Sequence, residues 1–197
     1  MSGIFGIIIA ALFSQNFILV KFLGICPFLG VSKKTDSALS MGIAVTLVMV
    51  ITCAVTYPIY VYILTPLGLQ YLEIIVFILV IASLVQMMEM ILKKFSPGLY
   101  SALGIYLPLV TTNCAILGVA ELVIAAGEKA GTWAYSYGEA VIYGLFAGIG
   151  FTIAIVLLSG LREKVDKYNI PKCLKGFPIT MIIACFMAMA FSVFSGL

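Results

Sequence analysis

The sequence has 197 residues, of which 63% are hydrophobic and 10% are charged, and its mean hydropathy is +1.23. Soluble domains are about half apolar and about a quarter charged, so a water-soluble core could not bury this much apolar surface. The formal charge of +3 is too small to indicate a nucleic-acid partner, and the absence of histidine removes the commonest metal ligand and general base. We therefore expect an integral membrane protein surrounded by lipid.

Six hydrophobic stretches are long enough to cross a membrane. A helix rises about 1.5 Å per residue and the hydrocarbon layer is about 30 Å thick, so a span needs about 20 mostly apolar residues. The stretches are Ile4–Ile25, Ala38–Tyr62, Tyr71–Leu92, Leu99–Val123, Ala140–Ser159 and Phe177–Phe194. Their connections are short, which predicts a single all-α transmembrane domain over residues 1–197.

The basic residues indicate how the chain crosses the membrane. The connections after the second and fourth stretches hold only Lys129, beside Glu128. Those after the first, third and fifth hold Lys33, Lys34, Lys93, Lys94, Arg162, Lys164, Lys167, Lys172 and Lys175. Because basic connections remain in the cytoplasm, we expect both termini outside.

The pattern C-x-x-L-G-V occurs twice. It covers Cys26–Val31, at the end of the first stretch, and Cys114–Val119, within the fourth. The chain then divides into approximate repeats, residues 1–95 and 96–197, each with three stretches. Because three is odd, the second half enters the membrane in the opposite sense, which predicts an inverted 3+3 repeat with a pseudo-two-fold axis in the membrane plane.

Polar residues lie just before both copies of the pattern. Asn16 and Lys21 precede the first copy, and residues 111–113 precede the second. In straight helices the two cysteines would lie about 20 Å or more apart. A site that used both therefore needs broken or half helices in the first and fourth stretches, which membranes tolerate where protein or a cavity covers the loosened backbone.

The chain has five cysteines, and this odd number excludes a fully paired disulfide framework. An iron–sulfur cluster commonly takes four thiolates, of which Cys26 and Cys114 would supply half and a partner the rest. The alternative is that both are small packing residues, and the residues alone do not separate these interpretations. Cys53 and Cys185 are expected to pack in apolar helices, and Cys173 to be a reduced thiol in a cytoplasmic connection.

Three segments carry a resemblance to a known family. They are QNFILVKFLGICPFLGVSKK, EMILKKFSPGLYSALGIYLPLVTTNCAILGVA and the closing FSGL. They resemble the RnfA component of Rnf complexes, in the RnfA/NqrE family, over essentially the whole chain. NqrE of the Na+-translocating NADH:quinone oxidoreductase, the sister family, tends to have C-T-F and T-V-N-C-A where this chain has CPF and TTNCA, which favours Rnf.

The resemblance implies a subunit of an ion-translocating ferredoxin:NAD+ oxidoreductase in the bacterial cytoplasmic (inner) membrane, with no NAD or ferredoxin site in this chain. It implies pairing with RnfE, a homologous protein of opposite topology, and assembly with RnfB, RnfC, RnfD and RnfG. Cys26 and Cys114 would hold half of a [2Fe–2S] cluster between this chain and RnfE. The chain would relay electrons through this cluster and couple their transfer to Na+ or H+ transport.

Residues around the two cysteines are expected to tune such a cluster through hydrogen bonds and burial. They are Thr111, Thr112, Asn113, Gly30 and Gly118. The two glycines could equally serve helix packing, which is the commoner role in membrane helices.

Three residues are weaker candidates for an ion path: Glu89, Glu121 and Asn16. Lys93 follows Glu89 by one helical turn, an arrangement more typical of an ordinary helix ion pair. The residues do not distinguish Na+ from H+.

Two other classes of function fit parts of the sequence. A secondary transporter would also use an inverted repeat and broken helices around a midplane substrate site, and it would carry no iron. A purely structural subunit would keep the cysteines only for packing.

Overall fold

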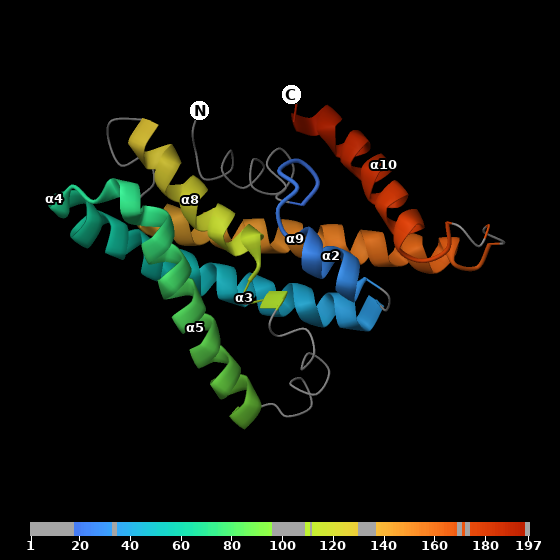
Figure 1. Cartoon of the computed structure of the whole chain (residues 1–197), viewed down its shortest axis with the longest axis horizontal. Coiled ribbons are helices and arrows are strands. Elements are labelled where there is room, and N and C mark those ends of the chain that lie inside the picture. The colour runs from blue at the N-terminus through green and yellow to red at the C-terminus, as the bar shows by residue number, and fades with distance from the viewer. Residues whose placement is uncertain are drawn as a thin grey trace.

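The computed structural model describes residues 18–32, 35–95, 109–110, 112–129, 137–168, 171 and 174–195. The regular elements within these ranges are all helical (Figure 1). They are α2 (Ile25–Val31), α3 (Thr35–Ile59), a π-helical turn (Tyr60–Leu64), α4 (Thr65–Leu67), a 3₁₀ turn (Gln70–Leu72), α5 (Glu73–Phe95), α8 (Cys114–Lys129), α9 (Tyr137–Val165) and α10 (Phe177–Ser195).

Three helical segments are long and apolar enough to cross a membrane: Thr35–Leu67, Glu73–Ile91 and Tyr137–Val165. They correspond to the second, third and fifth predicted stretches, so the all-α membrane class is confirmed. Two shorter apolar segments, Cys114–Ala125 and Phe177–Val193, fall within the fourth and sixth predicted stretches.

The first and fourth stretches differ from single straight helices where the structure describes them. Residues 18–24 form turns, and α2 begins only at Ile25, the last residue of the first predicted stretch. Helix α8 begins at Cys114, well inside the fourth, and the two residues before it are not helical. The remainder of the first stretch, and residues 99–108 of the fourth, lie outside the described ranges.

Helices α3 and α9 form the central pair and lie side by side (Figure 1). Glycines allow their close approach. A Cβ at Gly42 would lie 2.6 Å from Thr152 Cγ2, and a Cβ at Gly148 would lie 2.7 Å from Thr46 Cα. Any larger residue at either glycine would have to push the two helices apart.

Two threonines meet at this crossing. Their Oγ1 atoms lie 3.2 Å apart, while Thr46 donates to Gly42 O at 2.8 Å and Thr152 to Gly148 O at 2.9 Å. Each glycine therefore faces the threonine of the other helix, and each threonine bonds back to its own glycine. Such reciprocal contacts are what a two-fold axis produces.

The outer helices extend this reciprocity. Helix α5 packs against α3 and α8, whereas α10 packs against α9 and α2. Figure 1 shows α5 and α10 leaving the central pair on opposite sides. The largest fully buried side chains come from α2, α3, α5, α8 and α9, including Phe28, Met41, Phe77, Ile116 and Phe151.

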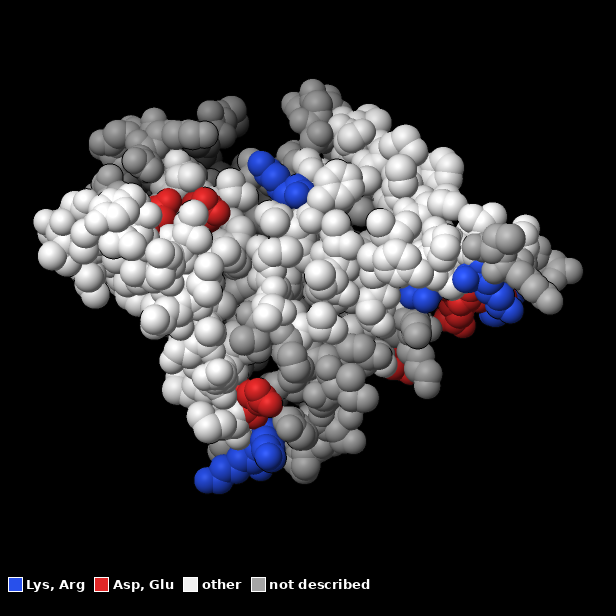
Figure 2. Space-filling model, in the orientation of Figure 1, with Lys and Arg blue, Asp and Glu red and all other residues white. Residues whose placement is uncertain are grey.

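Charged side chains are few on the face drawn in Figure 2. They gather mainly at the outer ends of α5 and α9, and much of the face between carries neither sign. Exposed large apolar residues cover the outer helices, for example Ile75, Leu79 and Phe186. Such a surface suits lipid or a membrane partner rather than water.

Candidate metal centre at two helix starts

Cys26 and Cys114 each lie in the first turn of a helix. Cys26 is the second residue of α2 and Cys114 is the first residue of α8. Both thiols are exposed on the chain. Cys53, by contrast, is buried against Gly144 in the α3–α9 contact, as predicted for a packing residue.

The other two cysteines lie away from this pattern. Cys185 is exposed on α10, although an apolar packing role was predicted for it. The chain's surface at α10 is apolar, so this thiol still lies among apolar neighbours such as Ala184 and Ala188. Cys173 lies outside the described residues.

A hydrogen bond connects the two helix starts. The Gly24 N–H, immediately before α2, donates to Cys114 Sγ at 2.9 Å, although the residues are 90 positions apart. The turn that precedes the Cys26 helix therefore touches the sulfur of the other motif. Sequence patterns gave no indication that Gly24 makes this contact.

Gly24 can adopt this position because it lacks a side chain. Its φ of 84° lies in the left-handed region. A Cβ there would lie 3.0 Å from Ala115 Cβ and 3.1 Å from both Asn113 Oδ1 and Phe151 Cε2. The start of α2 is therefore held closely against the start of α8.

Asn113 is the residue that caps α8. Its Oδ1 accepts the Ala115 N–H at 3.1 Å, which satisfies one of the free amides of the first turn. Its Nδ2 is buried and has no hydrogen-bond partner among the described residues. Leaving such a donor unpaired costs about 1–3 kcal/mol, so a missing acceptor beside this amide would be stabilising.

The two motif copies are seated in the same way. Along Cys26–Val31 the six positions are exposed, buried, buried, half-buried, half-buried and buried, and the same order holds along Cys114–Val119. The cysteine side of each short segment therefore faces outward while its valine faces the core. Equivalent burial supports a common structural role for the two copies.

A cavity of about 560 Å³ opens beside Cys26. It is lined by Ile25, Cys26, Leu29, Gly30, Arg162, Gly176, Phe177 and Thr180. Arg162, near the end of α9, is only 8% exposed. In the sequence this arginine indicated only orientation, and nothing in the pattern linked it to a cysteine 136 positions earlier.

The remaining predicted residues are placed as follows. Thr112 is exposed directly before Asn113, and Gly118 is half-buried in α8. A Cβ at Gly30 would meet only Leu109 Cδ1, at 3.8 Å, so a close helix contact does not require this glycine. Thr111 lies outside the described residues.

The ion-path candidates do not converge on the cysteines. Glu121 is exposed on α8 and Glu89 is half-buried on α5, while Asn16 falls outside the described ranges. Within the described part of the chain, no three or more Cys, His, Asp or Glu side chains gather as a metal site would need. The chain offers two thiolate ligands, and the rest would have to come from elsewhere.

The fold and these contacts define a helical membrane protein in which two related cysteine motifs start adjacent helices. The sequence model of a family described as "Rnf-Nqr subunit, membrane protein" matches residues 4–197, and the chain belongs to this family.

Three relatives, all A-type components of their complexes, align with nearly the whole chain. That of the Na(+)-translocating ferredoxin:NAD(+) oxidoreductase complex of Acetobacterium woodii is 53% identical over 191 residues, which cover 97% of this chain and 96% of the relative. That of the ion-translocating oxidoreductase complex of Syntrophotalea carbinolica is 48% identical, covering 100% and 98%. Its counterpart in Aliivibrio fischeri is 47% identical, covering 97% and 95%. The predicted resemblance to RnfA is thus confirmed.

Proposed function

We propose that this chain is a membrane subunit of an Rnf-type ion-translocating ferredoxin:NAD+ oxidoreductase. It relays electrons through an intramembrane [2Fe–2S] cluster shared with the homologous protein RnfE, and this transfer is coupled to Na+ or H+ transport. The names of its full-length relatives support the complex and the reaction. Neither nicotinamide nor ferredoxin binds to this chain.

The hydrogen bond from Gly24 to Cys114 Sγ is the observation that carries the cluster proposal. Two cysteines in straight spans would be too far apart to share a site. Here both begin helices, and the backbone before one contacts the sulfur of the other. The N–H donor would stabilise a thiolate at Cys114, and thiolates are the ligands that iron–sulfur clusters take.

The donor set of this chain fits half of a cluster. Cys26 and Cys114 would be the ligands, Gly24 N–H would bond to a sulfur, and the unpaired Asn113 Nδ2 would be a second donor. The cluster, when bound, supplies one-electron transfer at a potential set by these surroundings. The outward exposure of both thiols leaves room for two ligands from RnfE.

The reciprocal contacts at the centre support an inverted 3+3 repeat of residues 1–95 and 96–197. The pseudo-two-fold axis would pass between Thr46 and Thr152. The two halves differ in length between the cysteine motif and the threonine, partly because α8 has 16 residues and α2 has 7. Six spans in the inner membrane, with both termini outside and with RnfB, RnfC, RnfD and RnfG as further partners, complete the proposal.

The test is an iron and acid-labile sulfide assay, with EPR after dithionite reduction, on this chain co-purified with RnfE. We expect a [2Fe–2S] signal that disappears in the Cys26→Ala/Cys114→Ala variant while the two proteins remain associated. Cys185→Ala is the matched control, because this thiol is also exposed but lies on α10, and its signal should persist. An intact wild-type pair without iron would contradict the proposal and favour a transporter.

A further inference from the structure

Arg162 is a charged side chain in an unusual place. It lies in the last turn of α9 and is 8% exposed, although the helix around it is apolar enough to cross a membrane. Burying a charge is costly unless other groups compensate it. Its surroundings therefore indicate what the charge does.

The direct partners of Arg162 are neutral. Its Nη1 donates to Leu29 O at 3.3 Å and to Ser32 Oγ at 3.1 Å, at the end of α2. Leu29 lies one helical turn after Cys26, and both residues line the same cavity as Arg162. The guanidinium thus holds the helix that carries Cys26 and lies on the same side of it.

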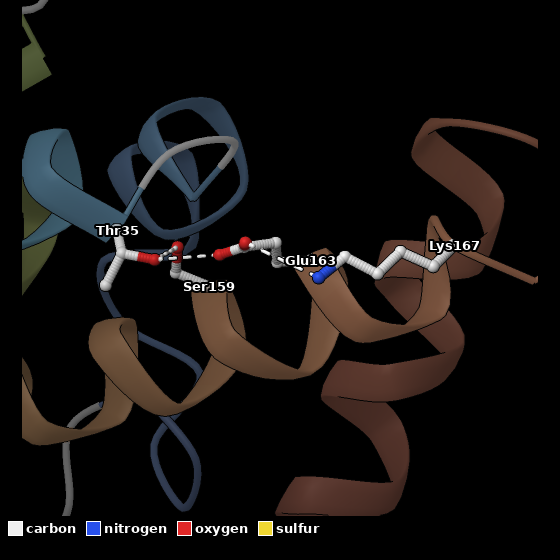
Figure 3. Close-up of polar contacts among 4 residues, drawn as sticks. All are labelled: Thr35, Ser159, Glu163 and Lys167. Carbon is white, nitrogen blue, oxygen red and sulfur yellow. Dashed lines mark hydrogen bonds and ion pairs between the residues drawn. The ribbon is translucent and has the colours of Figure 1, made fainter.

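No carboxylate neutralises Arg162 within the part of the chain that the structure describes. The adjacent Glu163 turns away: its Oε2 accepts a hydrogen bond from Thr35 at 3.4 Å, and its Oε1 lies 3.9 Å from Lys167 Nζ (Figure 3). Ser159 donates to the same threonine at 3.4 Å. The positive charge of Arg162 is therefore directed into the cavity uncompensated.

The repeat does not require this cation. In the register that pairs Gly42 with Gly148 and Thr46 with Thr152, the residue of α3 equivalent to Arg162 is Thr56. Thr56 is neutral, and its hydroxyl donates to Thr52 O at 2.8 Å. The arginine is thus specific to the Cys26 side.

We infer that Arg162 raises the reduction potential of the cluster held by Cys26 and Cys114; this inference rests on the function proposed above. A thiolate-ligated [2Fe–2S] cluster is anionic, and the electron it accepts makes it more negative. A fixed positive charge nearby stabilises the reduced form more than the oxidised form, and low dielectric strengthens this effect. Arg162 is a positioning and tuning residue that does not ligate iron.

The test is an EPR-monitored redox titration of this chain co-purified with RnfE. Arg162→Gln should shift the midpoint potential to lower values, and Arg162→Lys, which keeps the charge, should leave it near the wild-type value. Lys164→Gln removes the same charge from an exposed position on α9, and it should cause little shift because solvent screens it.

An unshifted potential in Arg162→Gln, with the cluster intact, would overturn the inference. If that variant fails to assemble, Arg162→Lys decides: a wild-type potential supports the role of charge, and a clear fall despite the retained charge overturns it. A wild-type pair with no cluster signal would instead refute the proposed function, so the two failures are distinguishable.

Discussion

Gly24 is the residue on which the contact between the two motifs depends. Replacement with alanine would force a side chain into the left-handed region, at about 1–2 kcal/mol, and bring its Cβ to 3.0 Å from Ala115 Cβ. We expect Gly24→Ala to lower the free energy of unfolding by more than the backbone cost alone. It should also change the EPR line shape, because the N–H to Cys114 would move.

Gly68 provides the control for that variant. Its φ is 66°, so alanine has a similar backbone cost, but nothing lies within 4 Å of the added Cβ. Thermal unfolding in detergent should therefore rank Gly24→Ala as less stable than Gly68→Ala. Equal losses would mean that the packing around Gly24 contributes nothing.

Asn113 combines two roles that substitutions can separate. Asn113→Ala removes the cap of α8 and should cost about 1 kcal/mol, whereas Asn113→Ser keeps an oxygen that can accept the Ala115 N–H. Unfolding measurements should show the loss for alanine and near-recovery for serine. Serine as unstable as alanine would argue against the capping role.

At the scale of elements, the α3–α9 contact should tolerate no added volume. Gly42→Ala and Gly148→Ala each place a Cβ under 3 Å from the opposite helix, and overpacking of this kind costs about 1–3 kcal/mol. We expect both variants to unfold at lower temperature in detergent. Gly160→Ala, on α9 with nothing within 4 Å of its added Cβ, should be neutral or slightly stabilising.

The two overpacked variants should differ in whether they can be rescued. The nearest atoms to Gly42 belong to the Thr152 side chain, so Thr152→Ala should restore part of the stability lost in Gly42→Ala. The nearest atom to Gly148 is Thr46 Cα, which no side-chain truncation removes. A double-mutant cycle in which Thr46→Ala rescues Gly148→Ala just as well would contradict this packing.

Hydropathy predicts the long helices well because lipid selects length and apolarity directly. The segment Tyr137–Val165 contains the predicted stretch Ala140–Ser159 entirely. Helix α2, with seven residues, is too short for any such signal. Its position depends on contacts with distant parts of the chain, from Gly24 to Cys114 and from Arg162 to Leu29, which a one-dimensional pattern does not contain.

The cysteine pair could be predicted and its surroundings could not. The repeated C-x-x-L-G-V pattern singled out Cys26 and Cys114, and both lie exposed at helix starts. Asn113 was named for its polarity, and its unpaired Nδ2 is consistent with that choice. Arg162 was missed because an arginine near the end of a span is ordinarily an orientation signal, and only its burial distinguishes it.

At the scale of the whole molecule, the reciprocal contacts and the charge distribution bear on the same question of orientation. The inverted repeat requires the ends of α5 and α9 to lie on the same side of the membrane, because each precedes a basic connection. Their charged side chains gather at those outer ends in Figure 2. The opposite ends, around Gly68 and Tyr137, would then face outward.

Site-specific labelling tests this orientation. In a chain with the exposed native cysteines replaced, Lys94→Cys at the end of α5 should react with a membrane-impermeant maleimide only in inside-out vesicles. Leu69→Cys, in the turn between α4 and α5, should react only in right-side-out vesicles, because one span separates the two positions. Labelling of both positions from the same side would show that α5 does not cross the membrane. Reversal of both would keep the span but refute the cytoplasmic placement of the lysines, and with it the argument that both termini lie outside.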